Sequence, residues 1–259
     1  MLTVVKVGGN IIDDEKKFSS FLEIFASIGG NKILVHGGGK IASNIGERLG
    51  IVPNYVDGRR ITNAETLKLV TMVYAGLINK NIVATLQSKG CNAIGITGAD
   101  ANIIKAVKRL VKDVDYGYVG DITESGIAVA NVSLLLNAGL VPVVAPLTHD
   151  GNGTMLNTNA DTIAQELAKA MCKVMAVQLV YGFEKDGVLK DATDNNSVIS
   201  EIMIADFDRL KNDGIINGGM LPKLQNACTA IQYGVSKVII GNAMHLPELI
   251  NGTAGTQII

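Results

Sequence analysis

Two apolar runs near the amino terminus end in glycines and carry the residue types that bind anions. Val4-Val5-Lys6-Val7 is followed by Gly8 and Gly9, and Ile33-Leu34-Val35-His36 is followed by three glycines that include Gly38 and Gly39. An apolar run of this length bounded by glycine is typical of a buried parallel strand. Glycines at its carboxyl end let backbone N–H groups approach an anion without a Cβ in the way. The pattern therefore predicts two turns that face phosphate or carboxylate.

Lys6 is the exceptional member of the first run. A cation in an otherwise apolar strand is costly to desolvate unless it meets an opposite charge. We therefore expect Lys6 to project from the strand end toward an anionic group.

A second polar cluster, Asn157-Thr158-Asn159-Ala160-Asp161, precedes an apolar-periodic helix. Helix capping explains one such residue, because Asn and Asp are preferred caps. Three polar groups in five positions exceed that need and indicate a binding site.

Two further segments carry candidate cations. Gly218-Gly219-Met220-Leu221-Pro222-Lys223 is a glycine-led helix entry with proline in the first turn. Arg59 and Arg60 follow Asp57-Gly58, and paired arginines beside glycine suit bidentate capture of a carboxylate. Exposure to solvent is the alternative for each of these cations.

The elements that must position these residues alternate between strand and helix. Strands are predicted at Val4–Val7, Ile33–His36, Asn92–Ile96, Val141–Ala145, Val174–Val180 and Lys237–Ile240, with helices around Phe18–Phe25, Asn131–Ala138, Asp161–Ala170 and Met220–Tyr233. A capping box at Thr62-Asn63-Ala64-Glu65 starts a longer helix that Gly90 ends. Short β-like stretches between Asn102 and Ile122 indicate hairpins. This order with parallel connections favours an α/β sandwich.

Composition limits the class of protein. The chain has 259 residues, 47% of them hydrophobic, and a net charge of −1, so we expect a compact globular protein without the field that nucleic acid or anionic membrane requires. No apolar stretch reaches the roughly 18 residues of a membrane span, and no signal segment opens the chain. Three cysteines in apolar surroundings favour reduced thiols in the cytoplasm, and the three histidines have no metal-ligand spacing, so no structural metal is expected.

Standard nucleotide signatures are missing. Gly37-Gly38-Gly39-Lys40 lacks the spacer and the Ser/Thr of a Walker A loop, and neither glycine turn reads G-x-G-x-x-G. A nicotinamide-dependent oxidoreductase is therefore poorly supported.

Taken together, the segments resemble the amino-acid kinase superfamily from end to end. The matching stretches stand in the family's order: Lys6-Val7-Gly8-Gly9, His36-Gly37-Gly38-Gly39, Asp57-Gly58-Arg59-Arg60-Ile61-Thr62, Gly139 to Pro146, Asn157 to Asp161, Asp186-Gly187-Val188, Gly219 to Lys223 and Gly255-Thr256. The resemblance implies a three-layer αβα sandwich with a mostly parallel central sheet, the fold of carbamate kinase and its relatives. It also implies a lobe over residues 1–172 that binds an acylated glutamate and forms a dimer interface, and a lobe over residues 173–259 that binds ATP.

The activity implied is ATP-dependent phosphorylation of the γ-carboxylate of N-acetyl-L-glutamate in arginine biosynthesis, with Mg²⁺ accompanying ATP. By the resemblance, Lys6 and Lys223 approach the transferred phosphoryl group and Asp161 holds both lysines. The implied substrate contacts are Gly38, Gly39, Arg60 and Asn157, and the implied nucleotide contacts are Gly8, Gly9, Glu184, Lys185, Asp186, Gly187, Val188, Leu189, Ile215, Ile216 and Asn217. Such a site works by alignment and charge neutralisation, and a carboxylate acceptor needs no general base.

The chain departs from the family pattern in two places. Phe183-Glu184 replaces the usual Thr-Asp in a nucleotide-facing loop and leaves the nucleotide preference open. Ile96-Thr97-Gly98-Ala99-Asp100-Ala101 replaces a more polar stretch near the expected acyl side, so N-succinyl-L-glutamate stays an alternative substrate. Another kinase of the superfamily and a non-catalytic binding relative are further alternatives.

The expected helix from Ala64 toward Lys89 has more apolar positions than one sheet can cover. A homodimer that buries this face is therefore expected. The first strand begins almost at residue 1, and by the resemblance this predicts a plain dimer without the arginine inhibition of hexameric relatives.

Overall fold

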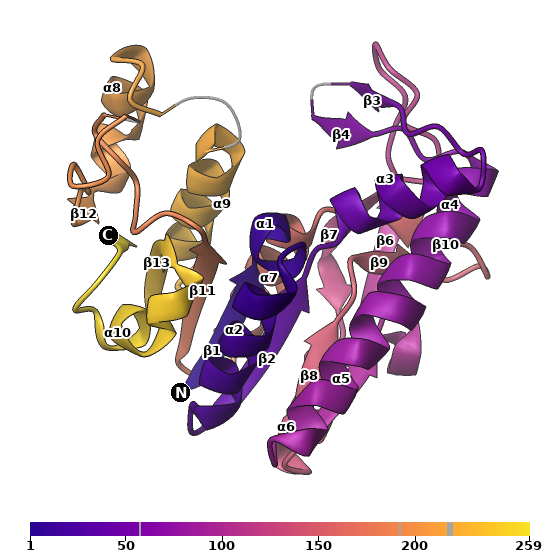
Figure 1. The fold of residues 1–259 in the computed structure, drawn as a ribbon, viewed down its shortest axis with the longest axis horizontal. Helices are drawn as coiled ribbons and strands as arrows, with labels where there is room; N and C mark the ends of the chain where they lie inside the picture. The colour runs from indigo at the N-terminus through magenta and orange to yellow at the C-terminus, as the bar shows by residue number, and fades with distance from the viewer. Residues whose placement is uncertain (57, 192, 217–219) are drawn as a thin grey trace. The chain divides into compact units, whose positions relative to one another are not determined.

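The computed structural model describes residues 1–56, 58–191, 193–216 and 220–259 (Figure 1). The chain folds into two compact units: unit 1 contains residues 1–32 and 164–259, and unit 2 contains residues 33–163. The predicted α/β class with a mostly parallel central sheet is confirmed. The first 32 residues pack with the carboxyl-terminal part of the chain, whereas the assignment of the two ligands to residues 1–172 and 173–259 stays a prediction.

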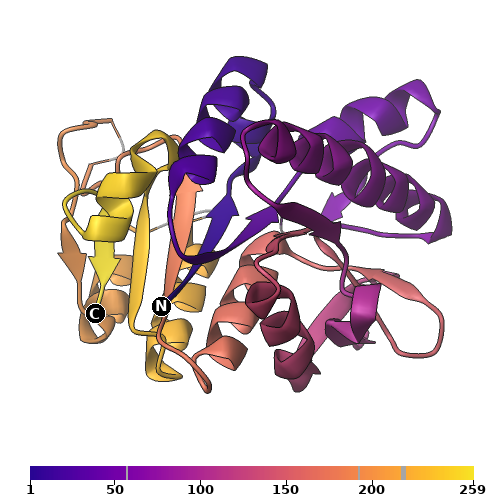
Figure 2. The ribbon, with the colours of Figure 1, turned by 90° about the horizontal axis from the view of Figure 1, so that it is seen from below.

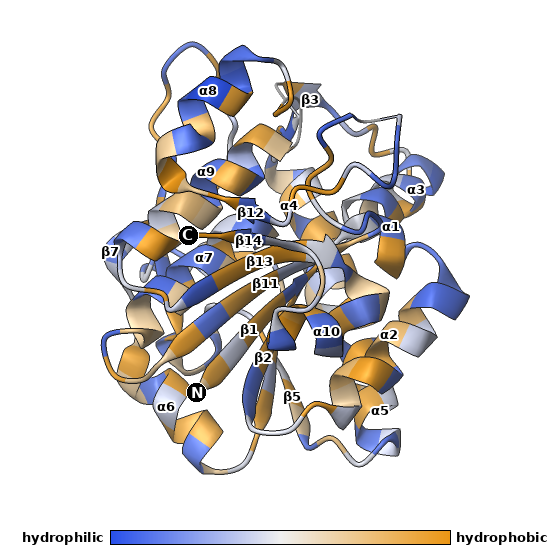
Figure 3. Cartoon of the chain, turned by 90° about the vertical axis from the view of Figure 1, so that its left-hand side faces the viewer, coloured by the Kyte–Doolittle hydropathy of each residue, from blue (hydrophilic) through white to orange (hydrophobic). Residues whose placement is uncertain are grey.

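Unit 1 is built on strands in the order β12-β14-β13-β11-β1. Strand β11 pairs in parallel with both β1 and β13, and β14 runs antiparallel to β13. Figure 3 shows these strands largely in the hydrophobic colour, and both chain ends belong to this unit (Figures 1 and 2). Its elements are β1 (Leu2–Val7), α1 (Gly9–Ile12), α2 (Glu15–Ser27), β11 (Val177–Phe183), β12 (Glu201–Ile202), η3 (Ile204–Asp206), α8 (Phe207–Asn212), α9 (Met220–Gln232), β13 (Lys237–Asn242), η4 (Ala243–His245), α10 (Leu246–Asn251) and β14 (Thr256–Ile258).

Unit 2 contains the parallel strands β2-β8-β5, a four-stranded sheet in the order β10-β9-β6-β7 and the hairpin β3-β4. Two elements cross the boundary between the units along the chain, β2 (Asn31–His36) and α7 (Ala160–Met171). The others are α3 (Gly39–Arg48), β3 (Tyr55–Val56), β4 (Arg59–Arg60), α4 (Ala64–Val70), η1 (Thr71–Ile78), α5 (Asn79–Ser88), β5 (Ala93–Ile96), η2 (Asp100–Asn102), β6 (Ile104–Lys108), β7 (Gly120–Ile127), α6 (Val129–Asn137), β8 (Val141–Val144), β9 (Leu147–His149) and β10 (Met155–Asn157).

The predicted long helix is one continuous element of α4, η1 and α5 whose middle section is π-helical. Its start differs from the expected capping box, because the side chain of Asn63 and not of Thr62 accepts the backbone N–H of Thr66, at 2.8 Å. By length and composition alone the helix could cross a membrane, which no segment was expected to do. Of its apolar window, 44% is buried inside the structure, and a single helix of this kind is weak evidence for a membrane span.

Strand β11 begins at Val177, three residues later than predicted. The reason lies in the end of α7, where the N–H groups of Val174 and Met175 both donate to the carbonyl of Met171. These residues therefore close the helix and do not extend the strand.

Candidate active site

The loop after β2 is shaped to present backbone N–H groups. Gly38 has a φ of +142° and precedes α3, whose first residue is Gly39. Because L side chains rarely adopt this φ, and a Cβ on Gly38 would also meet Cδ1 of Ile78, the turn favours glycine there. Since the first N–H groups of a helix have no intrahelical partner, this turn is suited to an anion.

Arg60 lies against this helix start. Its guanidinium donates from Nη2 to the carbonyl of Gly39 at 2.7 Å and to Oγ of Ser43 at 2.8 Å, and also to the hydroxyl of Tyr55. The guanidinium also stacks on the Tyr55 ring at 4.8 Å. Only 7% of Arg60 is exposed. The hydrogen bonds to Gly39, Ser43 and Tyr55 all leave from Nη2, and a guanidinium that presents Nε and Nη1 as a second edge is suited to a carboxylate.

Tyr74 borders the same turn from η1. Its side chain is buried, and this burial raises the pKa of its hydroxyl, while the nearby Arg60 acts in the opposite direction. A Cβ added to Gly39 would lie 3.9 Å from both the Tyr74 hydroxyl and Nη2 of Arg60. The glycine turn, Arg60 and Tyr74 therefore form one group in unit 2.

Asn157 joins this group through Thr62. Its Nδ2 donates to Oγ1 of Thr62 at 3.0 Å, and that hydroxyl donates to the backbone carbonyl of Arg60 at 3.2 Å. The polar residues before α7 therefore have different roles. Asn159 accepts from the N–H of Thr162 as a helix cap, and the buried Thr158 bonds to Thr148 at 2.8 Å. Capping accounts for Asn159 and leaves Asn157 for a site.

Asp161 lies half-buried in the first turn of α7, the position predicted for it. An acidic side chain in the first helical turn is favoured by the helix dipole.

In unit 1, Lys6 and Lys223 are both related to Tyr181. Lys6 on β1 is the register partner of Tyr181 on β11, so the two side chains project from the same face of the sheet. Nζ of Lys223 lies 4.9 Å from the centre of the buried Tyr181 ring. The structure therefore brings both predicted lysines to one residue.

The first glycine turn of unit 1 is equally close-packed. The N–H of Gly8 donates to the carbonyl of Gly182 at 2.8 Å, and a Cβ on Gly8 would lie 3.3 Å from that oxygen. Gly9 then begins the short helix α1.

The predicted nucleotide residues also belong to unit 1. Glu184 accepts from Nδ2 of Asn10 at 3.0 Å, and Asp186 accepts from Nδ2 of Asn242 at 2.9 Å. The N–H of Val188 donates to Oγ1 of Thr256 at 2.8 Å, which fixes the turn. Lys185, Gly187 and Leu189 lie in the same loop, Ile215 and Ile216 follow α8, and Asn217, Gly218 and Gly219 lie outside the described residues.

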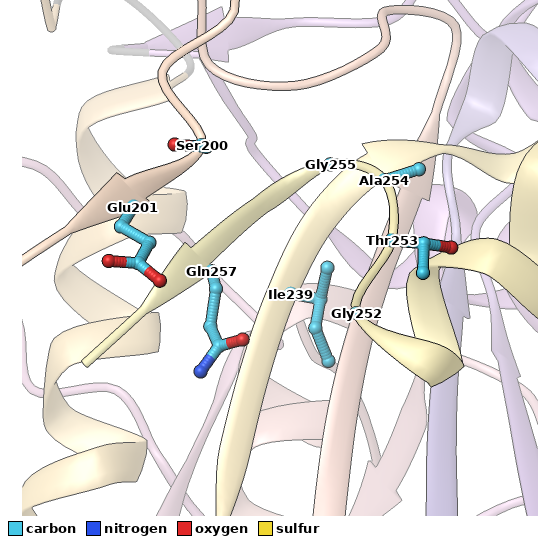
Figure 4. A pocket seen from close by; sticks show the side chains of 8 residues that line it. All are labelled: Ser200, Glu201, Ile239, Gly252, Thr253, Ala254, Gly255 and Gln257. Carbon is cyan, nitrogen blue, oxygen red and sulfur yellow. The ribbon is translucent and has the colours of Figure 1, made fainter.

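Two further cavities are lined by none of the implied catalytic, substrate or nucleotide residues, although the candidate cation Arg59 lines the second. The first, of about 120 Å³, lies beside β14 in unit 1 (Figure 4). The second, of about 500 Å³, is lined in unit 2 by Arg59, Val107, Lys108, Arg109, Leu110, Lys112, Val114, Tyr116 and Asp121.

Sequence reasoning did not identify Tyr55, Thr62 and Tyr74 as site residues. A signal existed only for Thr62, which follows Arg60 by two residues and was interpreted as a helix cap. Tyr55 and Tyr74 are placed by the β3-β4 hairpin and by the π-helical section, which the sequence pattern did not predict.

Comparisons with known proteins agree with this architecture. The family model described as the amino acid kinase family matches residues 1–242. An acetylglutamate kinase of Cytophaga hutchinsonii is 59% identical over 261 residues and covers 100% of this chain and 98% of its own. One of Bacteroides thetaiotaomicron is 55% identical, covering 99% of this chain and 98% of its own. The solved structure of smu.665 from Streptococcus mutans UA159 has a TM-score of 0.81 at 28% identity, over 99% and 98% of the two chains. On these matches the chain belongs to the amino acid kinase family, as the resemblance predicted.

Proposed function

We propose that the protein transfers the γ-phosphoryl group of ATP to the γ-carboxylate of N-acetyl-L-glutamate, a step of arginine biosynthesis. The observation that carries this proposal is the buried Arg60, which is held against the Gly38-Gly39 turn through Nη2. An arginine fork beside a helix N-terminus is suited to a carboxylate. The name acetylglutamate kinase, which relatives at 59% and 55% identity share, supports N-acetyl-L-glutamate as the molecule that carries this carboxylate.

In this proposal Arg60 holds the α-carboxylate, Asn157 binds the acylamino group, and Gly38 and Gly39 contact the substrate through their backbone. Lys6 and Lys223 neutralise charge on the transferred phosphoryl group, and Asp161 orients the lysines. The loops at 184–189 and 215–217, with Gly8 and Gly9, bind ATP, and Mg²⁺ arrives with the nucleotide as part of the substrate. The protein then contributes alignment and electrostatics, and these are the main requirements of phosphoryl transfer.

The test is an ATP-dependent assay in which hydroxylamine traps the acyl phosphate. Glutamate, N-acetyl-L-glutamate and N-succinyl-L-glutamate are compared at matched concentrations. We expect the acetylated substrate to give the highest kcat/KM. A higher kcat/KM for N-succinyl-L-glutamate would show that the substrate carries a succinyl group. If none of the three compounds gave a product, the proposed function would be contradicted.

We further propose that the protein works as a homodimer in the cytoplasm. The outward side of the long helix exposes Met72 at 58% and Leu77 at 48%, within a section whose other face is buried. A two-fold copy would cover these side chains. The three cysteines are thiols that are not joined in disulfides, which suits a reducing compartment.

A further inference from the structure

A buried polar pair lies directly behind the glycine turn. His36 ends β2, Asn79 begins α5, and both are 0% exposed. Nδ2 of Asn79 lies 3.2 Å from Nε2 of His36 and also donates to the backbone carbonyl of Val143 at 2.9 Å. Nδ1 of His36 lies 2.8 Å from the carbonyl of Gly37.

The proton positions in this pair follow from one fixed acceptor. The carbonyl of Val143 can only accept, so the amide nitrogen of Asn79, and not its oxygen, must point toward it. The second hydrogen of that nitrogen then points at Nε2 of His36, which must be the unprotonated ring atom. Nδ1 therefore carries the proton and donates it to Gly37.

The surroundings hold this arrangement in place. The oxygen of Asn79 accepts from Nζ of Lys80 at 3.2 Å, and the same Nζ donates to the carbonyl of Gly95 at 2.7 Å. A Cβ on Gly95 would collide with the side-chain oxygen of Asn79, so β5 needs glycine at this position. Burial, with a smaller contribution from Lys80, lowers the pKa of His36 to about 4, which keeps the ring neutral at physiological pH.

We propose that Asn79 and His36 are positioning residues that set the orientation of the Gly37 carbonyl and thereby of the Gly38 N–H. The carbonyl of Gly37 and the N–H of Gly38 belong to one planar peptide group, so holding the oxygen fixes the direction of the hydrogen. This inference rests on the proposed function, in which Gly38 contacts the acylglutamate. Misplacing such a donor by about 1 Å can lower the rate on the order of 10²-fold.

The first experiment replaces Asn79 by Leu, with Gln178→Leu as the control. Gln178 is also a buried amide, with 2% exposure and a bond to Thr3 at 2.8 Å, but it lies at the opposite end of β11 from Gly182. For N79L we expect kcat/KM for N-acetyl-L-glutamate to fall on the order of 10–100-fold while KM for ATP is unchanged. For Q178L we expect a loss of stability without this kinetic split. Equal kinetic effects in the two variants would overturn the proposal.

A second pair of variants separates the two ring nitrogens. His36→Asn retains an N–H near the Nδ1 position, whereas His36→Gln retains a polar group near the Nε2 position. If the bond to Gly37 is the one that matters, H36N keeps a higher kcat/KM than H36Q, and the reverse order contradicts the proposal.

A spectroscopic measurement tests the pair independently of activity. The ¹⁵N shifts of the imidazole of His36 should report protonation at Nδ1 in the unsubstituted protein and a changed tautomer balance in N79L. If no acylglutamate is phosphorylated, the proposed function is wrong. The ¹⁵N spectra then test on their own whether Asn79 controls the protonation of His36. The same tautomer with and without Asn79 would then overturn this inference.

Discussion

Asn157 donates from Nδ2 to the hydroxyl of Thr62, 95 residues away in the chain, at 3.0 Å. Because the same hydroxyl donates to the backbone of Arg60, the residue proposed for the acylamino group and the residue proposed for the α-carboxylate share one intermediary. Thr62 is fully buried, so loss of either bond would leave a polar group without water to replace its partner.

Thr62→Val should therefore impair acylglutamate binding without touching the substrate. The variant keeps the shape of the side chain and removes the acceptor of Asn157, so we expect KM for N-acetyl-L-glutamate to rise and KM for ATP to stay unchanged. Steady-state kinetics with each substrate varied in turn measures this. Thr85→Val, whose exposed hydroxyl bonds within its own helix at 2.9 Å, is the control.

Arg60→Lys should raise KM for the acylglutamate selectively. Lysine cannot reproduce the planar fork that reaches Gly39, Ser43 and a carboxylate at once. The matched control is Arg59→Lys, one residue earlier on the exposed side of β4. An equal rise in KM for ATP, or an effect confined to R59K, would show that the carboxylate clamp is placed wrongly.

Lys6→Ala and Lys223→Ala should each lower kcat far more than they weaken substrate binding. Removing one preorganised electrostatic group costs on the order of 3–4 kcal/mol, or roughly 10²–10³ in rate. Calorimetric binding of ATP and of N-acetyl-L-glutamate to each variant separates binding from turnover. The exposed Lys211 on α8 provides the control substitution. Near-normal kcat in a folded K6A or K223A would remove that lysine from the mechanism.

The free energy of unfolding should contain a term that depends on His36 and on pH. Burial lowers the pKa of His36 from 6.5 to about 4 in the folded protein, so the unfolded chain takes up the proton first as the pH falls. The stabilisation is complete above pH 6.5 and is lost progressively toward pH 4. It amounts to roughly 3 kcal/mol over this window. Urea unfolding of the unsubstituted protein and of H36N at pH 7, 6, 5 and 4 isolates the term, because the carboxylates titrate in both. Parallel stability curves would contradict it.

Light scattering at low micromolar concentration should report twice the 27.2 kDa chain mass, unchanged by arginine. Leu77→Glu on the outward side of η1 is expected to shift the protein toward monomer, since a charge there would have to be buried. Leu134→Glu, at a site that is 69% exposed on α6, should not. A monomer without any substitution would refute the dimer, and a six-fold particle that responds to arginine would refute the expected lack of feedback.

Several elements were predictable because each contains an apolar run of about four residues or an apolar repeat at helical spacing. Strands β1, β2, β5, β8 and β13 and helices α2, α6, α7 and α9 occur where the sequence places them. Short elements were missed, since the three-residue strands β9 and β10 are too brief to show a period. Lys32 shows a different difficulty. It precedes an apolar run, yet its side chain is 5% exposed and donates to the carbonyls of Phe25, Ala26 and Ile28 at the end of α2. A tertiary contact of this kind leaves no local pattern.

The candidate site was predictable at positions where the residue type itself indicates a role, such as glycine in an anion-binding turn and arginine for a carboxylate. Gly39 and Arg60 were expected to meet one ligand, and Arg60 donates a hydrogen bond to the carbonyl of Gly39 in unit 2. The partners that hold them, Tyr55 and Tyr74, were not foreseen because their positions depend on a hairpin and on the π-helical section. The ligand contacts themselves stay predictions.

The π-helical section also determines the directions in which the side chains of α5 point. The N–H of Asn79 donates to the carbonyl of Tyr74 five residues earlier, so Tyr74 and Asn79 stand one turn apart on the same side of the helix. In an α-helix that turn would hold one residue fewer, and each residue advances the side-chain direction by about 100°. A regular α-helix with i→i−4 pairing over the same residues would turn Asn79 away from the side on which Tyr74 stands, because five steps of about 100° do not complete a whole number of turns. It would have to give up either the tyrosine behind Arg60 or the amide behind His36.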